Sequence, residues 1–153
     1  MQNDLAFCRH KAPGHHLAVL HRLSAAFLAP RMRELGIRRG WIGVLLQVLE
    51  RPGQPQDALC KSLRVDPAAT ARTLFELEKR GYVERFEDAR DRRQKLVAPT
   101  QKALDLAQGL FAVLKDHNQA LFRGFDPSRR ELALCILADM AANLENAMTR
   151  DDS

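Results

Sequence analysis

The chain has 153 residues, the length of one domain, and 46% of them are hydrophobic, which is enough for a packed core. No uncharged apolar run reaches the length that a bilayer span requires, so no membrane partner is expected. Lysine and arginine number 24 against 19 acidic residues. The formal net charge of +5 favours a polyanionic partner without proving one.

The first residues and the cysteines indicate a cytoplasmic protein. The opening Met-Gln-Asn-Asp lacks the basic and apolar segments of a secretory signal. Cys8, Cys60 and Cys135 form no Cys-x-x-Cys pair, and an odd number of cysteines fits a reducing compartment. We expect free thiols, no metal centre and no cofactor.

The first predicted element is a helix over residues 16–35. Leucine and phenylalanine recur at helical spacing between Leu17 and Leu28. Pro30 should kink this helix or end it, and Gly36 should close it.

Three shorter helices are predicted for residues 41–50, 56–63 and 66–80. The first is a dense apolar run with the length of a buried core helix. The third has Asp66 as its N-cap and Pro67 at its first position, and Gly81 stops it. Its expected inward residues are Thr70, Leu74 and Leu77, and its outward or lateral residues are Ala69, Arg72, Thr73 and Glu76.

A hairpin with a basic tip is predicted next. Residues 82–86 and 94–98 alternate roughly as strands, and the polar segment between them contains Arg90, Arg92 and Arg93. The major groove admits a helix, and arginine is attracted to the narrow minor groove. A helix followed by such a hairpin therefore predicts a winged helix-turn-helix.

Two long helices are predicted to complete the chain. Thr100 can cap the first, in which apolar residues from Leu104 to Phe125 alternate spacings of three and four. This seam suits packing against another helix. Asp126 and Pro127 start the second. Together with the first helix of the chain, these helices are expected to form a separate layer. The three short helices between residues 41 and 80 are called the reader below, because they are the part expected to contact DNA.

A set of residues in the reader and hairpin is specific in combination. Its members are Pro52, Gly53, Gln54, Leu59, Val65, Asp66, Thr70, Arg72, Leu77, Glu78, Gly81, Tyr82, Val83, Arg85, Asp88, Asp91, Arg93, Val97 and Thr100. Over residues 36–103 the chain thereby resembles the MarR family of multiple-antibiotic-resistance-type regulators. The resemblance implies a mainly α fold with a small β-hairpin wing, in one domain over residues 1–153. Residues 37–99 would be the winged helix-turn-helix, and residues 1–36 and 100–153 the dimerisation layer.

The same resemblance implies how the protein works. A homodimer would place helix 66–80 of each subunit in the major groove of double-stranded DNA and Arg93 in the minor groove. Its two-fold symmetry predicts a pseudo-palindromic operator. Repression is the commoner outcome in the family. Asp91 and Arg85 are the candidates for orienting the wing, because a carboxylate close to Arg93 can hold its guanidinium through charge-assisted hydrogen bonds.

The candidate DNA contacts divide into apolar and polar ones. The reading helix begins Ala68-Ala69-Thr70-Ala71, and alanine offers only apolar contact, for example with a thymine methyl group. Hydrogen-bonded readout should therefore fall largely on Arg72 and Thr73. The full set of expected DNA-contacting residues is Lys61, Ser62, Ala69, Thr70, Arg72, Thr73, Arg90, Arg92 and Arg93.

Other interpretations of these residues stay open. The wing arginines can simply balance Glu87, Asp88 and Asp91, and Arg72 can pair with Glu76. A winged helix can also serve as a protein-interaction module that binds no DNA.

A metal- or redox-responsive sensor is a further alternative. His10, His15, His16 and His21 lie near Cys8, although their spacings match no compact ligand motif. Cys8 would sense an oxidant only where its surroundings stabilise a thiolate.

A small aromatic or phenolic effector is also expected. Candidate pocket residues lie where the helical layer meets the reader, at His21, Trp41, Leu45 and Phe111. No dinucleotide, phosphate-loop, zinc-protease or nucleophile-elbow motif is present, so we expect no enzymatic activity.

Overall fold

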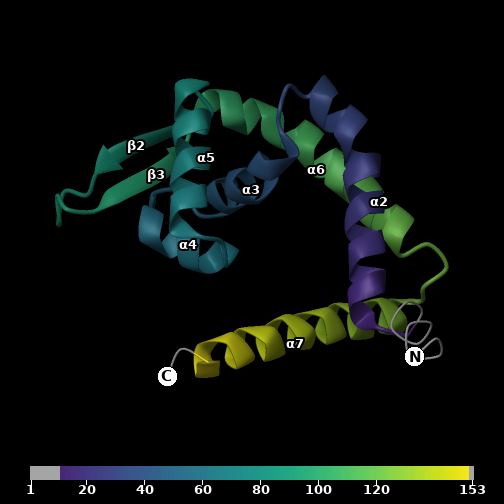
Figure 1. The fold of residues 1–153 in the computed structure, drawn as a ribbon. Coiled ribbons are helices and arrows are strands. Elements are labelled where there is room, and N and C mark those ends of the chain that lie inside the picture. The colour runs from purple at the N-terminus through teal and green to yellow at the C-terminus, as the bar shows by residue number, and fades with distance from the viewer. Residues whose placement is uncertain (1–10, 152–153) are drawn as a thin grey trace. The chain divides into compact units, whose positions relative to one another are not determined.

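The computed structural model describes residues 11–151 and divides the chain into two compact units, Met1–His117 and Asn118–Ser153 (Figure 1). Cys8 and His10 lie outside the described residues. The described part of the first unit begins with the long helix α2 (Pro13–Glu34), which has Pro13 in its first turn and basic residues in its last. It continues through Pro30 as far as Glu34. Leu28 and Met32, on either side of the proline, are buried and hold this last turn against the core.

The reader consists of short helices whose positions agree closely with the sequence pattern. A single 3₁₀ turn, η1 (Arg39–Trp41), leads into α3 (Ile42–Glu50). Helix α4 (Gln56–Leu63) and helix α5 (Pro67–Lys79) follow, separated by a turn at Arg64. The predicted mainly helical fold with a hairpin wing is confirmed by these elements.

The wing is part of a three-stranded antiparallel sheet with the order β1-β3-β2. Strands β2 (Val83–Glu87) and β3 (Lys95–Pro99) form the hairpin, with Arg85 opposite Val97. The short strand β1 (Gln54–Pro55) pairs with β3 on its other side and was not predicted. Pro55 lacks an N–H to donate, so this segment fits only at a sheet edge.

One hydrophobic core joins α2, the reader, the sheet and the start of α6 (Gln101–Leu121). Helix α3 lies at its centre, because Leu45 and Val48 are fully buried, as predicted for a core helix. The fully or almost fully buried side chains around them are Met32, Leu59, Leu74, Leu77, Val83, Val97 and Leu110. This core fixes the reading helix and the wing relative to each other.

Helix α6 has two apolar stripes, and only one of them packs into this core. Ala103 and Leu110 are fully buried, and Leu106, Val113 and Leu114 pack beside them. Leu104 and Phe111, which belong to the predicted seam, remain about half exposed. The helix ends at Leu121, one turn before the predicted seam ends, so Phe125 lies in the turn that follows.

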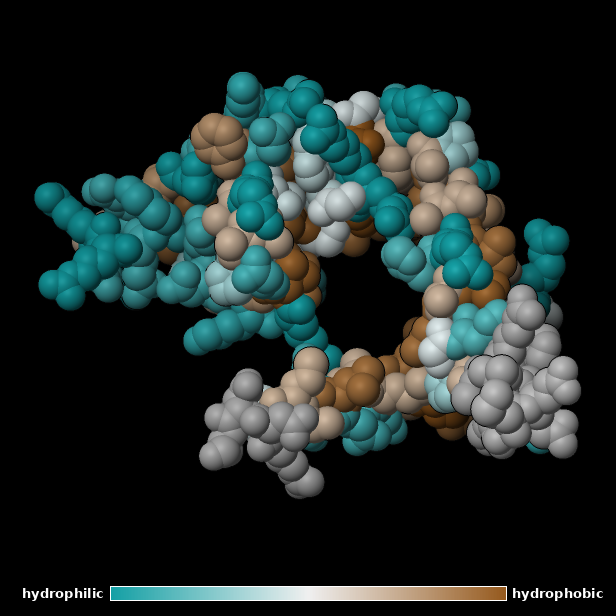
Figure 2. All heavy atoms as spheres, in the orientation of Figure 1, coloured by the Kyte–Doolittle hydropathy of each residue, from teal (hydrophilic) through white to brown (hydrophobic). Residues whose placement is uncertain are grey.

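The second unit contains the end of α6 and helix α7 (Pro127–Asp151). Large hydrophobic side chains are exposed on several faces of α7: Leu132, Leu134, Ile136, Leu137, Leu144 and Met148. Figure 2 shows hydrophobic residues at the surface along this helix, whereas the hairpin tip is hydrophilic. A helix that is apolar on most faces needs further coverage.

Among residues 11–151, no helix combines the length and the apolar character needed to cross a membrane.

The turn between α4 and α5 contains the one non-glycine residue with positive φ in the described chain, Arg64 at 52°. For a side chain with a Cβ this left-handed conformation costs about 1 kcal/mol. We therefore expect Arg64→Gly to be more stable than Arg64→Ala by about 1 kcal/mol, since both variants lose the arginine side chain and only one relieves the backbone. Urea unfolding of the pair measures this difference. Equal midpoints for the two variants would show that the turn is not strained.

Candidate nucleic-acid interface

Capping and apolar residues in its own sequence determine where the reading helix α5 begins and which face it buries. The Asp66 carboxylate accepts a hydrogen bond from the backbone N–H of Ala69 at 2.9 Å, and Pro67 occupies the first turn. Leu74 and Leu77 are fully buried and hold the inner face against the core. The opposite face is thereby presented to solvent.

Thr70 does not belong to the exposed face. It is 1% exposed, and its hydroxyl donates to the backbone carbonyl of Asp66 at 3.3 Å. The expected DNA contact at Thr70 is therefore corrected: the residue shares the inner face of α5 with Leu74, and its side chain packs in the core. Ala69 and Thr73 are half-buried at the edges of the outer face, and Arg72 is exposed on it.

Arg72 is available for an external partner. Within the described part of the chain its guanidinium makes no ion pair or hydrogen bond. Glu76, the acid four residues later that was considered as its partner, instead pairs with Arg80 at 3.8 Å. Arg72 therefore presents an uncompensated positive charge on the outward face of the helix.

The tip of the wing is held by side-chain to backbone hydrogen bonds. Asp88 accepts from the backbone N–H of Arg90 at 2.8 Å, and Asp91 accepts from the backbone N–H of Arg93 at 3.0 Å. Gln94 donates its side-chain amide to Asp91 at 3.3 Å. Both aspartates thus shape turns, as short acidic side chains commonly do.

This arrangement differs from the expected contact between the Asp91 carboxylate and the Arg93 guanidinium. Asp91 positions the backbone from which Arg93 projects and leaves the guanidinium unheld by any residue between 11 and 151. Arg90 and Arg92 are likewise exposed, and their guanidinium groups have no partner in the described chain.

The base of the wing is tied to the reading helix by an ion pair. Arg85 in β2 donates through Nε to the Glu78 carboxylate at 3.0 Å, and its Nη2 contacts the same oxygen. This hydrogen bond lowers the pKa of Glu78 from its ordinary value of 4.5, with only partial opposition from burial. Arg85 thus orients the wing through α5, a contact that sequence spacing did not reveal. Nearer the tip, Lys95 pairs with Glu87 at 3.0 Å.

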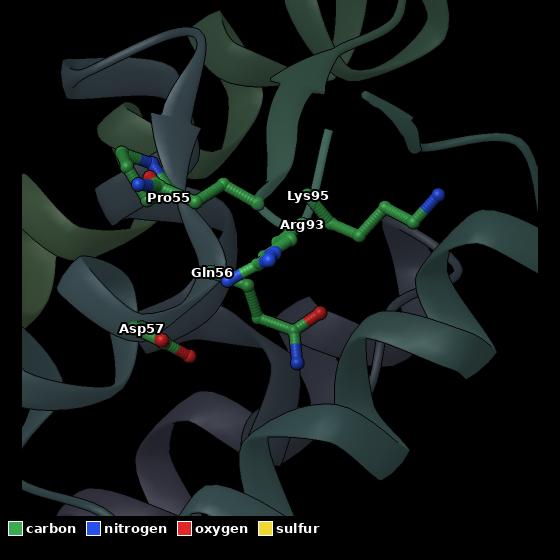
Figure 3. A pocket seen from close by; sticks show the side chains of 6 residues that line it. Pro55, Gln56, Asp57, Arg93 and Lys95 are labelled. Carbon is green, nitrogen blue, oxygen red and sulfur yellow. The ribbon is translucent and has the colours of Figure 1, made fainter. Parts of the chain in front are cut away.

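A polar hollow of about 210 Å³ separates the wing from the start of α4. It is lined by Pro55, Gln56, Asp57, Arg93, Gln94 and Lys95. In Figure 3 the Arg93 side chain is directed toward Gln56, whereas Lys95 extends away from it. Arg93 therefore lies at the side of the wing, next to α4, with room around its guanidinium.

The remaining expected contacts lie at the end of α4. Lys61 and Ser62 are both exposed in its last turn, just before Arg64. These positions suit contacts with a phosphate backbone, which fix the register of a protein on DNA.

The residues expected to line an effector pocket are not among those that line three hollows on the described part of the chain. Trp41 and Leu45 are buried core residues, Phe111 is 51% exposed, and His21 shares a 3.1 Å hydrogen bond with Arg39. His15, His16 and His21 take part in no cluster of three or more metal-ligating side chains within the described residues.

A contact near α5 that the sequence did not reveal is a stack of arginine and aromatic side chains. The guanidinium carbons of Arg38 and Arg80 lie 5.4 Å and 5.1 Å from the ring centre of Trp41. Arg38 is three residues from Trp41 in sequence, whereas Arg80 is distant and meets the ring only in the fold. Phe75 was also missed, although its position on the outer face follows from the helical period.

The comparisons with known proteins agree with a winged helix-turn-helix. Residues 42–95 match the model of the MarR family. An uncharacterized HTH-type transcriptional regulator of Bacillus subtilis, YybA, is 25% identical over 113 residues, covering 74% of this chain and 75% of that protein.

Two solved structures show the same fold over most of the chain. A MarR transcriptional regulator from Methanosarcina mazei is 27% identical, with a TM-score of 0.75 and coverage of 86% of this chain and 96% of the other. A mutant of MarR from E. coli in complex with operator DNA is 21% identical, with a TM-score of 0.78 and coverage of 88% and 96%. The second likeness concerns the fold alone.

The ion pair between Glu78 and Arg85 should make stability depend on pH. The pKa of Glu78 is lower in the folded protein than in the unfolded chain. The ion pair therefore stabilises the fold above the ordinary pKa of glutamate, and this stabilisation is lost as the pH falls through the folded pKa. We expect Glu78→Gln to cost about 0.5 kcal/mol near neutral pH, a value suited to a partly exposed pair, and nothing in strong acid. Urea unfolding between neutral and acidic pH measures this.

Glu84→Gln is the matched control, since Glu84 is an exposed glutamate next to Arg85 in β2. A Glu78→Gln variant whose stability follows the wild type and Glu84→Gln at every pH would contradict the role of the pair.

Proposed function

We propose that the chain is a homodimeric DNA-binding transcription regulator of the MarR type that acts as a repressor, a proposal supported by the MarR family match over residues 42–95 and by the likeness to the fold of a MarR regulator. Its ligand would be a pseudo-palindromic operator in double-stranded DNA, and it would work in the cytoplasm.

The observation that carries this proposal is that the arginines of the reading helix and the wing tip form no ion pairs with the described residues. Three nearby acids have other partners: Glu76 pairs with Arg80, Glu78 with Arg85 and Glu87 with Lys95. Asp57 lines the hollow beside Arg93, and the described residues show no ion pair between the two. The two wing aspartates bind backbone N–H groups. The charges of Arg72, Arg90, Arg92 and Arg93 are therefore not balanced by ion pairs within the described residues, contrary to the interpretation of a self-neutralised hairpin. Phosphate groups supply the missing negative charge.

Dimerisation is supported by the second apolar stripe of α6 and by the exposed side chains of α7. Leu104, Phe111 and Leu121 stay at least 40% exposed on α6. A second copy of the chain would cover both helices. Its two-fold symmetry would place the reading helices about 34 Å apart, in successive major grooves.

A small aromatic or phenolic effector belongs to the same proposal. It would act by binding one dimer shape better than another, because only differential affinity can shift such an equilibrium. The coupling would run through α6, which begins next to the reading helix and continues into the second unit.

A protein-interaction module is the competing function. Protein interfaces also use arginine, so a single exposed arginine would not separate the two functions. Four arginines without ion pairs among the described residues, spread over the reading helix and the wing, favour the repeated negative charges of DNA over a protein partner.

Replacing Arg93 with alanine should weaken binding to the operator about tenfold and reduce the dependence of affinity on salt by about two units of slope per dimer, since each wing loses one cation. Fluorescence anisotropy at several salt concentrations measures both quantities. Arg123→Ala, which removes an exposed arginine of the second unit, serves as the control and should change neither. Identical salt slopes for the wild type and Arg93→Ala would refute the wing contact.

Replacing Phe111 with aspartate should shift the protein toward monomer, because it places a charge in the exposed stripe of α6. Analytical ultracentrifugation at micromolar concentration measures this. Phe75→Asp makes the same change on the exposed face of α5 and should leave the protein dimeric. A wild-type association constant for Phe111→Asp would exclude this stripe from the interface.

A further inference from the structure

Phe75 is an aromatic residue on the outer face of the reading helix that none of the contacts above uses. Its side chain is 56% exposed, while Leu74 beside it in sequence is fully buried. Ala68, Arg72 and Phe75 follow the spacing i, i+4, i+7, so they share one stripe on the side opposite the core. An exposed phenylalanine on this stripe has no part in packing α5 against the reader.

Phe75 lines an open hollow of about 610 Å³ beside the reading helix. The other lining residues are Arg38, Ala71, Arg72 and Glu76. Arg38 comes from the segment before η1, where it lies 5.4 Å from the ring centre of Trp41. Two cations from different elements therefore line the same hollow as the Phe75 ring.

The charge of this hollow is positive. Its one acid, Glu76, is paired with Arg80 at 3.8 Å. Arg72 makes no ion pair with the described residues, and Arg38 contacts the face of a tryptophan instead of a carboxylate. An apolar surface with two cations beside it suits a ligand that presents a hydrophobic group between phosphates.

We propose that Phe75 is a specificity-determining residue that contacts the C5-methyl group of a thymine in the major groove, with Arg72 and Arg38 on the flanking phosphates. The thymine methyl is the apolar group that distinguishes this base in the major groove, and phenylalanine is one of the side chains suited to it. Ala68 on the same stripe adds a second, smaller apolar contact. The inference rests on the proposed DNA-binding function and gives it a base preference.

The experiment compares thymine with deoxyuridine, which differs only by lacking the methyl group. Duplexes that bind the full-length wild-type protein are first selected from a random pool. Each thymine of the selected site is then replaced in turn by deoxyuridine, and affinity is measured by fluorescence anisotropy at fixed salt. For the wild-type protein we expect the deoxyuridine substitution at one position in each half-site to lower the affinity about fourfold, which is the factor for one buried methyl-sized group.

Phe75→Ala should bind the thymine duplex about as weakly as wild type binds the deoxyuridine duplex, and it should not distinguish the two. Phe75→Leu should restore part of the discrimination, because it restores an apolar side chain. Phe86→Ala removes another exposed phenylalanine, in β2, and should keep the full wild-type difference. Since Phe75 is exposed, circular dichroism should show all variants folded.

Two different results would overturn the inference, and each has a separate meaning. Failure to select any duplex would refute the proposed function along with the inference. Selection of a duplex without a methyl effect at any thymine, or an undiminished methyl effect in Phe75→Ala, would refute the role of Phe75 and leave DNA binding in place.

Discussion

The junction at the end of α5 is the constraint on which the reader depends. Gly81 takes a positive φ of 72° there and turns the chain into β2. The Thr100 hydroxyl donates to the Gly81 carbonyl at 2.6 Å, and Lys102 donates to the Arg80 carbonyl at 2.8 Å. Lys102 also lies 4.4 Å from the ring centre of Tyr82. The start of α6 thereby satisfies carbonyl groups that a helix end leaves open, and it joins the reading helix, the wing and α6 at one point.

The contacts around this junction and in the wing tip explain why the arginines of a short hairpin do not form ion pairs with its own carboxylates. Arg85 uses Glu78 to fix the base of the wing on α5, and the aspartates of the tip are occupied by the backbone. Carboxylates that complete turns have less capacity left for guanidinium groups. The guanidinium groups of the tip therefore stay available at the outer edge of the wing, as the proposed contact with DNA requires.

The sequence predicted the elements best where a signal is local. Asp66 and Pro67 mark the start of α5 within one residue, because capping depends only on neighbouring positions. The contact between Glu78 and Arg85 and the strand β1 were missed, since both depend on which segments the fold brings together. Thr70 was assigned to two faces at once, and burial places it on the inner one. Phe75 needed only the helical period, but the outward residues predicted from that period did not include it.

In the proposed function, the two apolar stripes of α6 would connect recognition of DNA with dimerisation. One stripe holds Leu110 in the core that positions α5, and the other leaves Phe111 half exposed. Adjacent residues of one rigid helix therefore serve the two surfaces. In the proposed dimer, a shift of α6 at its exposed stripe would be transmitted to the junction at Gly81, because closely packed cores absorb little displacement. A ligand that alters the packing of the helical layer would thus change the spacing of the two reading helices without touching either of them.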